Sequence, residues 1–144
     1  MFGLSSAIEK AKLGAIETIS ANIMIADANL NIRYMNAATT TLLKEAESDL
    51  KKELPRFDMA TLIGANIDIF HKSPSHQRNM LASLRKQHKA TITVGTRVFD
   101  LIVTPLMEGQ KVTGFVVEWA DAKARLLNLD YQGQMEALGR VQAI

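Results

Sequence analysis

The chain has 144 residues, of which 47% are hydrophobic and 22% are charged, a composition typical of one folded domain. Its 17 basic and 15 acidic side chains are spread along the sequence, so there is no basic stripe that would indicate a nucleic-acid partner. No run approaches the ~18 apolar residues of a membrane span, and the lack of cysteine excludes disulfides, thiolate metal sites and cysteine-based flavin photochemistry. Because the first residues do not form a signal peptide, the expected location is cytoplasmic.

The first half of the chain predicts a helix, a hairpin and then more helices. Apolar residues recur at helical intervals up to Ile19, which predicts an amphipathic helix over residues 1–19. Two β-rich runs, 22–26 and 30–35, are separated by the turn-forming sequence Asp-Ala-Asn and predict an antiparallel hairpin. Residues 37–54 turn helical before Pro55, Asp58 is the expected cap of a short helix over 59–63, and a longer helix is expected to run to about Gln87.

The second half predicts three strands and a last helix. The strands cover residues 89–95, 96–106 and 111–121 and are joined by short turns. Together with the first hairpin they predict an α+β fold, a five-stranded antiparallel sheet with the short helices on one face and a helix at each end. Residues 122–144 form the C-terminal helix, which has no stop signal. The expected organisation is therefore an N-terminal helix (1–19), a sensor domain (20–121) and a C-terminal linker helix (122–144).

Three strings, NIMIADANLNIRYMN, IGANIDIFHKSPSHQRNML and GFVVEWAD, resemble the PAS domains over about residues 19–121. The form FHKSPSHQR followed by VVEWAD resembles PAS domains of bacterial methyl-accepting chemotaxis receptors, and among them the haem-binding modules of soluble aerotaxis receptors. The resemblance implies a haem b cofactor, a diatomic gas ligand such as dioxygen, and downstream PAS or signalling domains in the same chain. The segment LGRVQAI at the C-terminus echoes LGAIETI of residues 13–19, which favours such a further PAS domain.

The same resemblance assigns roles to three residues. His71 corresponds to the axial histidine that holds the iron, and Leu101 and Trp119 correspond to the residues that line the gas-binding side. The chain departs from the family where Asp121 is followed by Ala-Lys, because PAS domains commonly have Asp-x-Thr there. This departure concerns the usual contact at the start of the C-terminal helix.

The residues themselves leave a simpler interpretation open. If Glu118 faces solvent, the period of a strand turns Trp119 toward the helices, where it would be an ordinary core residue, and Leu101 is an inward-facing residue of the preceding strand. His71 alone would be a locally hydrogen-bonded histidine. His76 and His88 bracket the long helix and are weaker cofactor-binding candidates, as donors to haem carboxylates or as iron ligands in place of His71.

A second class of function is a haem-free PAS domain that serves dimerisation and relay or binds another small ligand, with a flavin less favoured. The terminal helices carry apolar stripes that one small sheet cannot cover, which predicts self-association with or without haem. These stripes comprise Ile8, Ile16 and Ile19 at one end and Leu126, Leu129, Met135 and Leu138 at the other. The sequence has no Gly-rich phosphate loop, no paired metal-spaced histidines and no Ser-His-Asp pattern, so an enzyme is not expected.

Overall fold

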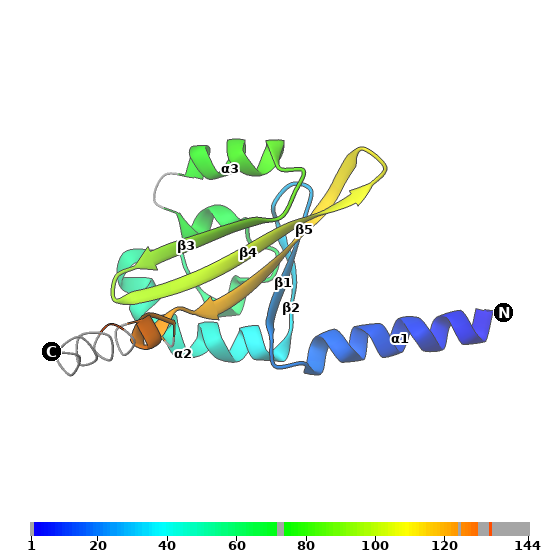
Figure 1. The fold of residues 1–144 in the computed structure, drawn as a ribbon, viewed down its shortest axis with the longest axis horizontal. Coiled ribbons are helices and arrows are strands. Elements are labelled where there is room, and N and C mark those ends of the chain that lie inside the picture. Colours follow the sequence, from blue (N-terminus) through cyan, green and yellow to red (C-terminus); the bar gives the residue numbers. More distant parts are fainter. Residues whose placement is uncertain (1, 72–73, 124, 130–132, 134–144) are drawn as a thin grey trace, which may run out of the picture.

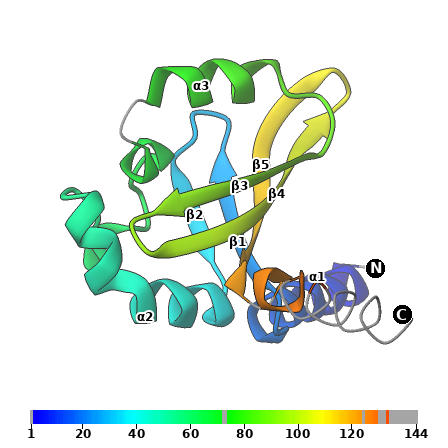
Figure 2. The ribbon, with the colours of Figure 1, turned by 60° about the vertical axis from the view of Figure 1, so that its left-hand side comes forward.

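The computed structural model describes residues 2–71, 74–123, 125–129 and 133. Within them one antiparallel sheet has the strand order β2-β1-β5-β4-β3, and the helices between β2 and β3 cover one of its faces (Figures 1 and 2). The strands are β1 (Asn22–Asp27), β2 (Ile32–Met35), β3 (His88–Val94), β4 (Arg97–Glu108) and β5 (Lys111–Asp121), and the helices are α1 (Phe2–Thr18), α2 (Ala37–Glu53), α3 (Pro74–Ser83) and the 3₁₀ turns η1 (Met59–Thr61) and η2 (Ile67–Phe70). The predicted five-stranded α+β fold is confirmed.

The turn of the first hairpin is longer than the sequence predicts. The Asp27 carboxylate accepts the backbone N–H groups of Asn29 at 2.9 Å and Asn31 at 3.0 Å. Leu30 has a φ of 69°, in the left-handed region that few residues other than glycine adopt. Because a left-handed residue cannot continue a strand, β2 begins at Ile32 instead of residue 30.

One buried amide joins the start of α2 to the end of α1. Asn36 is fully buried, and its side-chain oxygen accepts the Thr39 N–H at 3.1 Å, which caps the helix. Its amide nitrogen donates to the carbonyls of Ile16 at 2.9 Å and Ala21 at 2.8 Å. This side chain therefore fixes the point at which α1 meets the domain.

The predicted cap at Asp58 is confirmed. The Asp58 carboxylate accepts the backbone N–H at the start of η1.

The predicted end of the long helix at Gln87 is wrong. Helix α3 ends at Ser83, whose hydroxyl donates to the Met80 carbonyl at 3.0 Å. The Arg85 guanidinium donates to the carbonyls of Ala82 at 3.1 Å and Leu84 at 3.0 Å. These bonds occupy carbonyls that a further helical turn would need. His88 consequently opens strand β3 and does not stand next to the end of the helix.

Close packing between two strands requires glycine at position 114 of the sheet. A Cβ at Gly114 on β5 would lie 2.7 Å from the carbonyl oxygen of Ala26 on the neighbouring strand β1. Real Cβ atoms do not approach that closely, so only glycine lets the two strands lie at this separation.

Helix α1 projects from the domain and extends away from the sheet (Figure 1), and Ile8, Leu13 and Ile19 are exposed on or next to it. Residues 123 and 125–129 are helical after β5, and their three leucines, at positions 126, 127 and 129, are also exposed. The rest of the expected C-terminal helix, with Met135 and Leu138, lies outside the described residues. No helix in the described part of the chain is long and apolar enough to cross a membrane.

Candidate ligand-binding site

A cavity of about 250 Å³ lies between the inner face of the sheet and the helices η2 and α3. Side chains of all three long strands line it, together with Met80 and Leu81 of α3. The lining is apolar apart from two histidines, Thr91 and the indole of Trp119. A largely apolar cavity with few polar groups is the usual form of a small-molecule site.

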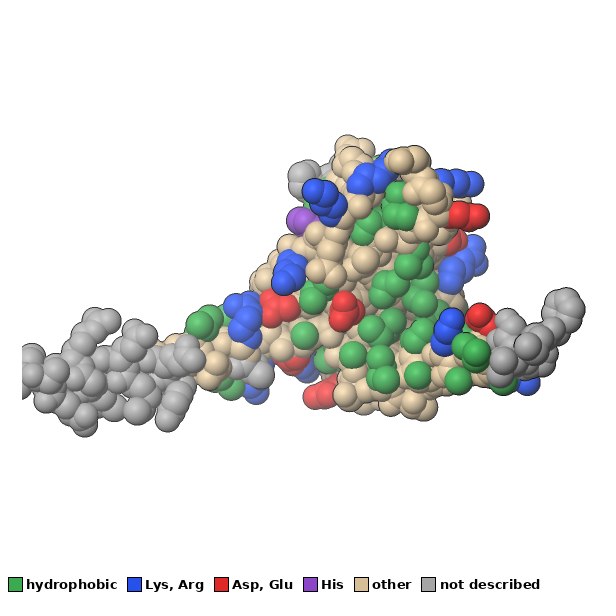
Figure 3. Space-filling model, turned by 45° about the vertical axis from the view of Figure 1, so that its right-hand side comes forward, with side chains coloured by type: hydrophobic (Ala, Val, Ile, Leu, Met, Phe, Trp, Pro, Cys, Tyr) green, Lys and Arg blue, Asp and Glu red, His purple; other side chains and the backbone are tan. Residues whose placement is uncertain are grey.

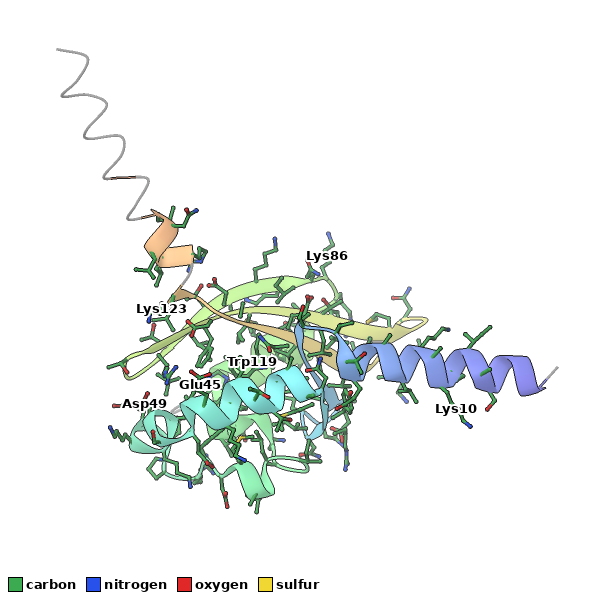
Figure 4. All side chains as sticks on the ribbon, turned by 90° about the horizontal axis from the view of Figure 1, so that it is seen from below. Lys10, Glu45, Asp49, Lys86, Trp119 and Lys123 are labelled. Carbon is green, nitrogen blue, oxygen red and sulfur yellow. The ribbon has the colours of Figure 1, made fainter. Side chains whose placement is uncertain are left out.

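Trp119 and Leu101 form one wall of this cavity. They are direct partners across the β4–β5 ladder, so their side chains lie on the same face of the sheet. Trp119 is 5% exposed and lies in the interior between the sheet and α2 (Figure 4). Its ring centroid is 5.1 Å from that of Phe70 and 5.4 Å from that of Phe99. The predicted orientation of Trp119 toward the helices is confirmed, and two aromatic contacts fix its ring.

The indole nitrogen of Trp119 has no hydrogen-bond partner. Among the described residues, Trp119 Nε1 is the one buried side-chain nitrogen or oxygen atom without an acceptor or donor. A buried unsatisfied N–H costs about 1–3 kcal/mol. An acceptor atom bound within hydrogen-bond distance of Nε1 would remove this cost.

His71 lies at the cavity next to η2. The Asn66 side chain caps η2 at the Asp68 N–H (3.2 Å), and the His71 N–H donates to the Asp68 carbonyl at 3.1 Å. The imidazole is half-buried, and this burial lowers the pKa of His71 below its ordinary value of 6.5. The ring is therefore neutral near pH 7, the state in which imidazole coordinates a metal.

His88 lines the same cavity from the first position of β3, where Val103 is its partner on β4. Lysine and arginine side chains gather at the end of the domain that carries α3 (Figure 3), and Lys86 and Lys89 are exposed there. The side chain of His76 falls outside the described part of the structure. The structure thus brings together four of the five predicted site residues.

Sequence reasoning missed two features of the site. Phe70 both lines the cavity and contacts the Trp119 ring, and its only sequence signal was its position directly before His71. Leu30 lines the cavity from the left-handed turn of the first hairpin. No local pattern marks this leucine, because its position depends on the turn and on the bond from the Ile67 N–H to its carbonyl at 3.0 Å.

The residues present fit a haem in their chemistry. The described residues contain no group of three or more metal-ligating side chains, but a haem iron needs one neutral histidine from the protein on its proximal side. His71 supplies the neutral histidine. The lining is apolar like the porphyrin ring, and the free indole N–H can donate to a ligand of the iron. The cavity of about 250 Å³ lies just below the range of roughly 300–1,000 Å³ for small-molecule pockets. A haem would enter only if the lining widened around it.

The antiparallel order 2-1-5-4-3, with helices and a cavity on the inner face, defines a PAS domain. No family model matches the chain. Over 120 residues it is 46% identical to the methyl-accepting chemotaxis protein McpB of Pseudomonas aeruginosa, and this match covers 82% of the chain and 18% of the receptor. The chain therefore spans less than a fifth of the length of this curated relative.

Solved structures agree on the family. The Aer2 receptor from Vibrio cholerae, a dual PAS-haem oxygen sensor, is 35% identical with a TM-score of 0.63, over 70% of this chain and 93% of that one. A PAS domain from Colwellia psychrerythraea shares the fold alone, with 13% identity and a TM-score of 0.56 over 79% of this chain and 96% of that one. The chain belongs to the PAS domain family, and the resemblance to PAS domains of chemotaxis receptors is confirmed.

Proposed function

We propose that the chain is a haem-b-binding PAS sensor module of a chemotaxis receptor, and that it responds to a diatomic gas, most directly dioxygen. The observation that carries the proposal is the unpartnered Trp119 N–H in an apolar cavity that a neutral His71 also lines. Similarity to a PAS-haem oxygen sensor supports the same reading. When bound, the haem supplies an iron atom that binds the gas.

The protein's own residues would hold and orient the two ligands. His71 would hold the iron through its neutral imidazole, and Trp119 would donate its N–H to the bound gas. Leu101, across the ladder from Trp119, would keep the surroundings of the gas narrow and apolar. His88 and His76, with Lys86 and Lys89, would supply donors to the haem carboxylates.

The module would act by relay and not by catalysis. Trp119 lies two residues before Asp121, the last residue of β5, so a reorientation of its ring reaches the C-terminal helix directly. In this proposal residues 20–121 sense the gas, and the segments 1–19 and 122–144 connect the sensor to signalling domains elsewhere in the receptor. The contacts with those domains would then be made by these two segments.

The test is an ultraviolet-visible titration of the purified protein with haem. The wild type should develop a strong Soret band with about one haem per chain, and His71→Ala should lose the coordinated spectrum. His88→Ala is the matched control, because it removes a second cavity histidine and should weaken binding without changing the coordination. A wild-type protein that stays colourless after haem addition contradicts the proposal, and a flavin spectrum of the protein as isolated would replace it.

A haem-free role in dimerisation and relay is the second candidate function. It is supported by the large apolar side chains that stay exposed on the terminal helices, such as Leu13 at 65% and Leu127 at 57%. The double variant Leu13→Ser/Leu127→Ser should self-associate more weakly in sedimentation experiments, whereas Lys10→Ser should not. Unchanged association of the double variant would contradict a helix-mediated dimer.

A further inference from the structure

The C-terminal helix follows β5, but its first turn forms an ion pair with β4. Arg125, in the first turn after β5, donates from Nε to Asp100 Oδ2 at 2.7 Å and from Nη2 to Asp100 Oδ1 at 3.0 Å. Asp100 belongs to β4 and also accepts the Thr91 hydroxyl of β3 at 2.8 Å. Two parallel bonds from one guanidinium give this pair the geometry in which a surface ion pair contributes to structure.

The anchoring residue Asp100 is next to the cavity wall. It directly precedes Leu101, and successive side chains of a strand point to opposite faces, so Asp100 faces outward where Leu101 faces the cavity. Leu101 is the ladder partner of Trp119. A displacement of β4 that makes room for a ligand at Leu101 must therefore also move the Asp100 carboxylate.

The Arg125–Asp100 ion pair also links the sheet to the C-terminal helix in a chain that lacks the usual threonine at position 123. Position 123 is lysine where PAS domains commonly have threonine, and its backbone N–H donates to the Asp121 carboxylate at 2.8 Å. The Ala122 N–H donates to the Val98 carbonyl at 2.9 Å, which is a second attachment to β4. The side-chain connection between sheet and helix comes from Arg125.

We propose that the Arg125–Asp100 ion pair transmits the state of the cavity from β4 to the C-terminal helix. The inference rests on the proposed function for the identity of the ligand, whereas its geometry does not depend on it. Arg125 and the Thr91 hydroxyl hold the pKa of the Asp100 carboxyl below its ordinary value, so the pair stays charged near neutral pH. Ligand entry would then change the orientation of the helix through β4, and this path would act alone for carbon monoxide, which carries little negative charge when bound and so accepts little from the Trp119 N–H.

A spin label on the C-terminal helix can test this path. The chain has no cysteine, and Leu129 is 54% exposed, so Leu129→Cys gives one labelled site. The electron spin resonance line shape of the haem-loaded ferrous protein should change when carbon monoxide is added, and Asp100→Asn should abolish this change. The charge-swapped Asp100→Arg/Arg125→Asp protein should recover it, which a purely structural role would not produce.

The control variant breaks an ion pair of the same type elsewhere. Arg33 Nε donates to the Asp27 carboxylate at 2.8 Å in the first hairpin, so Arg33→Gln should leave the response of the label intact. All variants should keep the Soret band and the carbon monoxide affinity of the wild type. A response that persists in Asp100→Asn with haem bound, or no response in the wild type, overturns the proposal.

A second arm works without haem, so that the two proposals can fail separately. Leu101→Phe adds volume to the cavity wall, with Leu101→Met as a milder change, and each should alter the line shape of the label at position 129 in the haem-free chain. Combining either with Asp100→Asn should remove the alteration. The absence of a Soret band would contradict the proposed sensor function alone. A change in line shape that persists when Asp100→Asn is added would contradict the proposed role of the ion pair.

Discussion

The inner face of the sheet has two halves that differ in packing. Under α2 the core is closed, since Leu43, Leu50, Phe57 and Leu62 are no more than 1% exposed. Under α3 only three residues form a second buried cluster, and they line part of a cavity of about 250 Å³. Trp119 belongs to the closed core and also lines the cavity. One sheet thus carries a closed core at one end and a cavity at the other.

The two covering helices account for the difference. Helix α2 has 17 residues and buries four of them against the sheet. Helix α3 has 10 residues and ends early at the bonds made by Ser83 and Arg85. A shorter helix covers less of the sheet, and the uncovered apolar area becomes the wall of a pocket.

The largest expected difference in stability is between two leucine-to-alanine variants, one in each half of the sheet. Leu43→Ala removes a fully buried side chain from the closed core and should lower the free energy of unfolding by about 3–5 kcal/mol, because it leaves a cavity that cannot collapse. Leu101→Ala, at the wall of an existing cavity, should cost only about 1 kcal/mol. Urea denaturation of the haem-free protein measures both. Equal losses would show that the two halves are packed alike.

A smaller difference is expected between two asparagine caps. Asn36→Ala removes a buried amide and should cost about 3 kcal/mol, because it also removes the donor to the carbonyls of Ile16 and Ala21. Asn66→Ala, which removes the cap of η2 beside the cavity, should cost about 1 kcal/mol because water can replace its bonds. The midpoints of urea unfolding should rank the variants in that order. The reverse ranking would place the rigid part of the domain at the cavity.

The smallest effect concerns pH and His71. Because burial lowers the pKa of His71 in the folded state below 6.5, the unfolded chain takes up a proton first as the pH falls. The haem-free protein should therefore lose stability as the pH falls through 6.5 toward the lowered folded value, and His71→Asn should show less of this loss. Urea midpoints at several pH values between 7.5 and 5, roughly one unit either side of the ordinary histidine pKa, measure it. A pH dependence unchanged by His71→Asn would contradict the half-buried neutral imidazole.

Much of the fold could be predicted because its signals are local. Strand periodicity gave the meander and the inward side of Leu101 and Trp119, and Asp58 identified the cap of η1. The site was harder to predict because its features depend on tertiary structure. The early end of α3 results from side-chain bonds to its last carbonyls, and the position of Leu30 results from a left-handed turn. The lack of a partner for Trp119 Nε1 requires knowledge of every neighbouring atom.

The most direct test of the central claim is the rate at which dioxygen leaves haem-loaded Trp119→Phe, with carbon monoxide release as the reference. Phenylalanine keeps an aromatic ring next to Phe70 and Phe99 but has no N–H. Loss of one hydrogen bond of about 1.4 kcal/mol predicts dioxygen release about tenfold faster. Carbon monoxide, which carries little negative charge when bound, should leave at a nearly unchanged rate. Equal changes for the two gases, or none for dioxygen, would contradict the role of the Trp119 N–H as the donor to the ligand.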